Sequence, residues 1–137
     1  AMIDQGKSKM SKRKSIEAPG FSHANPIPAA SRIGDIMMSS VISGRDPASG
    51  EMPDDQAQQI INIFSHIGST VEAAGGSTDD IIKITFWVDD AAAGRAALNG
   101  EWVKMFPDEE SRPARHTLSA GGGRPGQVTC DFIAVFG

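Results

Sequence analysis

The sequence has little of what marks membrane-bound and secreted proteins. It holds one cysteine, Cys130, among 137 residues, and no tyrosine. A single cysteine cannot close an intrachain disulfide, and within an apolar run it is expected to pack as a small hydrophobic residue. No apolar run approaches the length of a membrane span, and the basic N-terminal segment lacks the apolar stretch of a signal peptide. We therefore expect a cytoplasmic protein that makes no contact with a membrane.

The signatures of common cofactor and catalytic sites are also missing. The glycine run at 121–123 precedes an expected strand rather than a helix, so it does not fit a phosphate-binding loop. The three histidines lack metal-ligand spacing, and no G-x-S-x-G segment supplies a nucleophilic serine. The 17 acidic residues against 13 basic ones give a net charge of −4, which disfavours electrostatic binding of nucleic acid. We expect no cofactor, no metal and no nucleic-acid partner.

The chain is long enough for one domain with a core of its own. We expect a mobile basic tail over residues 1–14 and a single domain over residues 15–137. Hydrophobic periodicity and turn residues predict an irregular loop at 19–28, helices at 54–74 and 91–106, and strands at 15–18, 35–43, 81–88, 114–119 and 128–136.

Helices of this length fit on one face of a mixed sheet, which gives a two-layer α+β domain. We expect the other sheet face to carry Arg115 and its neighbouring hydroxyls and to seek a partner. Homo-oligomerisation through that face is the natural expectation.

The strand at 114–119 carries the most informative pattern. Alternation places Arg115, Thr117 and Ser119 on one face. If this strand forms a hairpin with the closing run, Arg115 lies beside Thr129 or Asp131. A guanidinium fixed on a strand can bind a small carboxylate through paired hydrogen bonds. The simpler alternative is an ion pair with Asp131 or with a neighbouring chain.

Two further segments hold candidate polar side chains. Phe21 and His23 lie in the irregular loop. In one interpretation both side chains form the wall of a pocket. In the other, Phe21 packs on the core and His23 points to solvent. Ser40 interrupts the apolar strand at 35–43 and needs a hydrogen-bond partner, which a ligand can provide. His66 falls on the polar side of the first helix, so solvent exposure is expected.

Taken together, four segments resemble the Rid/YjgF family of imine and enamine deaminases. They are the turn at 46–51, the helix end at 71–75, the strand at 80–85 and the Arg-Pro-Ala-Arg segment at 112–115. The resemblance runs from about residue 15 to the C-terminus. It implies a chorismate-mutase-like α+β fold, assembled as a homotrimer with clefts between subunits.

The resemblance also implies roles for individual residues. Arg115 matches the arginine that pairs with the carboxylate of a 2-imino acid, whose hydrolysis yields a 2-oxo acid and ammonia. Ser40 matches a strand serine that bonds the substrate or a water molecule, and backbone groups at Val41 assist the carboxylate. Orientation of the substrate, rather than a strong base, would supply much of the acceleration.

The sequence departs from the family at several of these positions. Thr129 stands where the deaminases carry a glutamate that positions the water, Phe21 stands at the entrance-loop tyrosine, and Thr117 stands at a position that is often cysteine. Asp131 shares a face with Thr129 but lies two residues along the strand. His23 is the alternative base, because an imidazole titrates near neutral pH.

Three functions follow from this pattern. The first is a deaminase acting on a small imino or enamino carboxylic acid. The second is a non-catalytic trimeric protein that binds small carboxylates. RNA cleavage, which is associated with relatives of the family, is the least favoured, because the chain is acidic and has no convincing acid–base pair.

Overall fold

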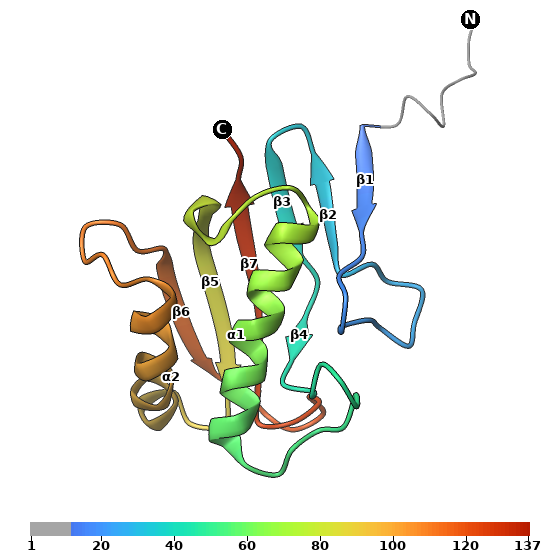
Figure 1. Cartoon of the computed structure of the whole chain (residues 1–137). Coiled ribbons are helices and arrows are strands. Elements are labelled where there is room, and N and C mark those ends of the chain that lie inside the picture. The colour runs from blue at the N-terminus through green and yellow to red at the C-terminus, as the bar shows by residue number, and fades with distance from the viewer. Residues whose placement is uncertain (1–11) are drawn as a thin grey trace, which may run out of the picture.

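The computed structural model describes residues 12–137. The prediction of a basic tail at 1–14 therefore lies largely outside the described residues, although Arg13 and Lys14 belong to the first strand. The chain forms a mixed sheet and two α-helices (Figure 1). In chain order the elements are β1 (Arg13–Ile16), β2 (Ala30–Ile33), β3 (Ile36–Ser39), β4 (Ile42–Ser43), α1 (Gln56–Ala73), the 3-10 helix η1 (Thr78–Asp80), β5 (Ile81–Val88), α2 (Ala91–Met105), β6 (Ala114–Ser119) and β7 (Val128–Val135).

The strands lie in the order β1-β2-β3-β7-β5-β6, and the short β4 continues beside β7. All neighbouring strands are antiparallel except β5 and β6, which are parallel. Both helices cover the same face of the sheet (Figure 1). The predicted two-layer α+β architecture is confirmed. The predicted hairpin of β6 with β7 is wrong, because β5 lies between these strands.

The first helix begins where the sequence provides a capping residue. The side chain of Asp55 accepts a hydrogen bond from the backbone N–H of Ala57 at the helix start. One stripe of the helix is apolar and packs on the sheet, with Ile63 and Ile67 fully buried. The predicted helix of about five turns is thus present as 18 residues.

The second helix approaches β5 closely at one residue, Gly94. Asp90 caps it by accepting from the N–H of Ala93, and Gly94 faces β5. A Cβ atom at Gly94 would lie 2.6 Å from Cγ2 of Val88, a distance that real side chains do not adopt. The glycine therefore permits the close packing of α2 on β5, and its low helix propensity is tolerated for that reason.

The strand predicted at 35–43 is interrupted in its middle. The backbone N–H of Ser40 donates to the carbonyl of Ala29 (2.9 Å), and its hydroxyl donates to the carbonyl of Pro28 (2.8 Å). These bonds turn Ser40 away from β7 and separate β3 from β4. The predicted order also lacked β2, which pairs with both β1 and β3.

The sheet face opposite the helices is rich in apolar side chains. Several of them are 40% exposed or more: Ile33, Ile36, Met38 and Val135. An uncovered apolar sheet face of this kind marks a contact surface. Within residues 12–137, no helix is both long and apolar enough to cross a membrane.

Candidate functional site

Arg115 lies on the helix-covered face of the sheet, not on the open face as predicted. In register it pairs with Ile84 of β5, which in turn pairs with Phe132 of β7, and both partners belong to the buried core. Because β6 is the edge strand, Arg115 can run along the core boundary with its charged end near solvent. By alternation, His116 faces the open side of the sheet, as do Ala114 and Leu118.

The guanidinium of Arg115 is held by α2 rather than by Asp131. Its Nη2 donates to Oδ1 of Asn99 over 3.0 Å, and its Cζ lies 5.0 Å from the centre of the Trp102 ring. Its Nη1 is buried and has no hydrogen-bond partner among the described residues. Burial, followed by the nearby charge of Arg95, lowers the pKa of Arg115 below its usual range. The residue remains a cation at neutral pH, and its Nη1 has no acceptor within residues 12–137.

A second unsatisfied polar atom lies on the same face of β6. Thr117 is 7% exposed, and its Oγ1 is buried without a hydrogen-bond partner. Ser119, two residues further on, is different, because its hydroxyl accepts from the backbone N–H of Ala91 at the start of α2 (2.8 Å). The contact between α2 and β6 thus holds a cationic N–H donor and a hydroxyl that have no hydrogen-bond partner within residues 12–137. Those are the groups that a carboxylate ligand requires.

Phe21 and His23 lie together at the other edge of the sheet. Phe21 is 7% exposed, and its ring centre lies 5.1 Å from that of His23. Both line a hollow of about 630 Å³ whose wall also includes Arg45 and Pro47. Phe21 therefore packs on the core while bordering the hollow. His23 does not simply point to solvent, since its Nε2 is buried and has no hydrogen-bond partner.

Ser40 and Val41 occupy the break between β3 and β4. The hydroxyl proton of Ser40 is already directed to the carbonyl of Pro28, so the side chain can offer a ligand only its acceptor lone pairs in this arrangement. Val41 is 44% exposed. Val41 is thus an exposed residue beside a half-buried Ser40.

Thr129 and Asp131 lie on the open face of β7. Thr129 is 3% exposed and is flanked by Ser43 and Trp87. Asp131 is partly exposed and pairs in register with Thr85. Burial raises the pKa of the Asp131 carboxyl, while the charge of Lys83 acts against this increase. Asp131 is thus the carboxyl group of this strand face, and it lies across the sheet from the guanidinium of Arg115.

One chain does not bring all the predicted site residues together. From β4 the sheet continues through β7 and β5 to β6, so three strand spacings, about 14 Å, separate the Ser40–Val41 segment from Arg115. The Phe21 loop is further away, beyond β3 (Figure 1). The candidate residues thus form an Arg115–Thr117 group at one edge and a Phe21–His23 group towards the other.

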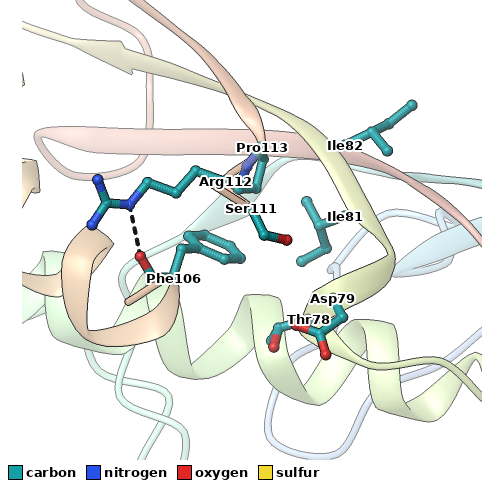
Figure 2. Close-up of a pocket in the computed structure, with 8 residues that line it drawn as sticks. All are labelled: Thr78, Asp79, Ile81, Ile82, Phe106, Ser111, Arg112 and Pro113. Atoms are coloured by element: carbon teal, nitrogen blue, oxygen red, sulfur yellow. Dashed lines mark hydrogen bonds between the residues drawn. The ribbon is translucent and has the colours of Figure 1, made fainter. Parts of the chain in front are cut away.

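Another hollow, of about 220 Å³, lies below the start of β6. Figure 2 shows the guanidinium of Arg112 directed away from Thr78 and Asp79, and its Nε donates to the carbonyl of Phe106 (2.8 Å). The guanidinium of Arg112 is therefore held by the backbone that follows α2. This hollow presents no free cation to a ligand.

Two single-residue expectations have different outcomes. His66 is 1% exposed, and its Nε2 lies 2.7 Å from the carbonyl of Arg45, so the prediction of solvent exposure is wrong. Its ring packs 4.9 Å from Phe21, which explains the burial. Cys130 is fully buried as predicted, and burial raises the pKa of its thiol well above the usual value. Among residues 12–137, no cluster of three or more His, Cys, Asp or Glu side chains is arranged to hold a metal ion.

Sequence reasoning missed the α2 side of the site. Arg95, Asn99 and Trp102 recur at intervals of four and three residues and so form one stripe of the helix. The interval was visible in the sequence. Its significance depends on knowing that this stripe faces β6 rather than solvent.

Comparison with solved structures defines the class of protein. The YjgF gene product of E. coli has the same fold, with a TM-score of 0.77 and 27% sequence identity, over 89% of this chain and 98% of that one. Curated relatives are RutC family proteins. That of Haemophilus influenzae is 30% identical over 66% of this chain and 70% of its own length. That of Aquifex aeolicus is 29% identical over 55% of this chain, and the aligned part spans 59% of the relative.

A match between the chain and a model of a protein family identifies the family. The model described as Endoribonuclease L-PSP matches residues 21–126, which is most of the chain. The chain belongs to this family, and the predicted resemblance to Rid/YjgF proteins is confirmed.

Proposed function

We propose that the protein is a deaminase that hydrolyses a small 2-imino carboxylic acid to a 2-oxo acid and ammonia. The observation that carries the proposal is the pair of buried, unpartnered polar atoms on one face of β6, Nη1 of Arg115 and Oγ1 of Thr117. An unsatisfied buried donor destabilises the fold unless an acceptor reaches it, and a carboxylate satisfies both groups at once.

The reaction follows from this anchoring. When the carboxylate of the substrate is bound by Arg115 and Thr117, the imine carbon of the substrate is held in one position and exposed to water. The oxygen of water bonds to that carbon, the nitrogen takes up a proton, and the resulting carbinolamine expels ammonia as the C=O bond forms. Orientation supplies most of the acceleration, because an oriented encounter removes much of the entropic barrier. The partly exposed guanidinium presents its free N–H groups to the carboxylate by rotating about its terminal bonds.

A neighbouring copy of the chain supplies the rest of the proposed site. The Phe21–His23 group and the Arg115–Thr117 group lie toward opposite edges of the sheet, and copies joined head to tail in a ring place such edges side by side. The open apolar face supports assembly of this kind, and a homotrimer is the ring that we propose. In it, His23 of one copy serves as base for water at the Arg115 of the next copy, with Thr129 and Asp131 on the inward-facing sheet surface.

The first experiment measures ammonia release from 2-imino acids generated in place by an amino-acid oxidase. We expect acceleration by the wild type, loss of it in Arg115→Ala, and unchanged activity in the matched control Lys104→Ala, which removes an exposed cation of α2 that pairs with Glu101. Acceleration that persists in Arg115→Ala would refute the proposed role of the guanidinium.

The second experiment tests whether the site is shared. If His23→Ala lowers the rate, mixing it with Arg115→Ala under subunit exchange should restore activity, because about a quarter of the sites in random rings then carry both native residues. No recovery, despite exchange shown by mass measurement, would place both residues in one copy or remove His23 from the site. Unchanged turnover in His23→Ala would exclude it as the base.

A second function is favoured by one observation: none of the contacts described for Arg115 is made with a carboxylate or an imidazole. A trimeric protein that binds small carboxylates without turnover fits that arrangement. Thermal stabilisation by 2-oxo acids without ammonia release distinguishes it from the deaminase. RNA cleavage, which the family description Endoribonuclease L-PSP suggests, remains the least favoured function because the chain is acidic.

A further inference from the structure

The α2 side of the α2–β6 contact carries a second cation that the proposed reaction does not use. Arg95 lies one helical turn before Asn99, on the stripe of α2 that contacts Arg115. Arg95 is exposed, and no hydrogen bond or ion pair links it to another residue within 12–137. Its charge is close enough to act on Arg115.

Two hydrogen bonds fix how the helix and the strand lie against each other. Ala91, at the start of α2, donates to Ser119 near the end of β6, whereas Asn99 accepts from Arg115 near the strand's beginning. The two elements therefore run antiparallel. Between these two fixed points, the helical turn that carries Arg95 lies beside Thr117.

The α2–β6 contact consequently offers two anchoring points for negative charge. The first is Arg115 with Thr117. The second is Arg95, which lies about 5 Å along the helix, one turn, from Asn99, the residue that holds Arg115. The amide of Asn99 is thus next to Arg115 and one helical turn from Arg95. Its Oδ1 accepts from Arg115, which leaves its N–H groups to donate. Among residues 12–137, no carboxylate forms an ion pair with Arg95 or Arg115, so the two positive charges on this side of α2 are not neutralised by a salt bridge.

We infer that the substrate is dicarboxylic: a 2-imino acid whose side chain ends in a second carboxylate. This inference rests on the proposed function, because the first carboxylate occupies Arg115 and Thr117 as described above. The distal carboxylate pairs with Arg95 and accepts from the amide of Asn99. Short dicarboxylic acids match the offset between the two anchoring points, and long flexible arginine side chains adjust to the difference between four and five carbons.

The binding test uses stable 2-oxo acids and does not depend on turnover. Calorimetry at constant ionic strength compares 2-oxoglutarate with 2-oxobutanoate, which lacks the second carboxylate. We expect the wild type to bind 2-oxoglutarate roughly fivefold more tightly, as for an exposed ion pair. Arg95→Gln should abolish this preference, and the control Lys104→Gln should retain it. Equal affinity of the wild type for both acids, or a preference that survives Arg95→Gln, overturns the inference.

The kinetic test separates this inference from the proposed function. Imines of glutamate and of 2-aminobutanoate are generated in place, and ammonia release is followed for the wild type and Arg95→Gln. We expect Arg95→Gln to raise KM for the dicarboxylic imine alone and to leave kcat unchanged. Equal effects on both imines overturn the dicarboxylate inference. Acceleration of neither imine, with the binding preference intact, refutes the deaminase and leaves the dicarboxylate site standing.

Discussion

Replacing Thr117 by valine should make the protein more stable and weaken its binding of carboxylates. The hydroxyl of Thr117 is 93% buried with the rest of the side chain and makes no hydrogen bond in the described chain. A buried hydroxyl without a partner costs about 1–3 kcal/mol, and valine keeps nearly the same shape without that cost. We expect a gain of about 1 kcal/mol in the free energy of unfolding, or roughly 4 °C in Tm for a chain of this length.

The matched control is Thr70→Val on α1. Thr70 is also buried, and its Oγ1 also lacks a partner in the described chain, but it lies on α1 rather than at the α2–β6 contact. Both valine variants should gain stability in urea unfolding. Only Thr117→Val should lose affinity for 2-oxo acids, by about tenfold, since a hydrogen bond to a charged group is removed. A destabilised Thr117→Val with normal affinity would refute this reasoning, because the hydroxyl would then have a structural partner.

Three further changes test the fold around the site. Gly94→Ala should lower the free energy of unfolding by about 1–3 kcal/mol in urea titration, because the added Cβ would lie 2.6 Å from Cγ2 of Val88. Unchanged stability would mean that α2 moves away from β5 without cost. Asp131→Asn should be as stable as the wild type at low pH and more stable at neutral pH. Burial raises the pKa of this carboxyl in the folded state, so the wild type loses stability as pH rises from the unfolded pKa through the folded one. A stability difference between Asp131→Asn and the wild type that is independent of pH would contradict this cause. His66→Leu should lower stability by about 1–3 kcal/mol in thermal unfolding, since it leaves the carbonyl of Arg45 without its 2.7 Å partner, and an unchanged Tm would show that water replaces the ring.

Local sequence signals located the helices and most strands. The helix starts carry aspartate caps, and the apolar stripe of α1 has the period of a helix, so both features are encoded within a few residues. The missed strand β2 has no such signal. It contains four residues and is held by pairing on both sides, which no local pattern reveals.

The face of Arg115 could not be predicted from its strand alone. Alternation correctly grouped Arg115 with Thr117, but it does not say whether their face meets helices or solvent. That depends on the parallel pairing of β6 with β5, in which Arg115 lies beside the buried Ile84. An arginine and two hydroxyls suggested an open face, whereas the edge position allows polar side chains at the rim of the core. His66 was misplaced for a similar reason, because a polar residue on a helix is buried when a backbone carbonyl accepts its proton.

The positions of the unpartnered polar atoms in the described chain favour a site shared between two copies of the chain. There are four of these buried side-chain atoms, and three of them belong to His23, Arg115 and Thr117. Domains are stable by only about 5–15 kcal/mol, so three such atoms at about 1–3 kcal/mol each are a substantial fraction of that stability. They are grouped at two separate places toward opposite edges of one sheet, rather than scattered through the core. A ligand bound between adjoining copies would satisfy both groups at once, and binding would then strengthen assembly as well as the fold.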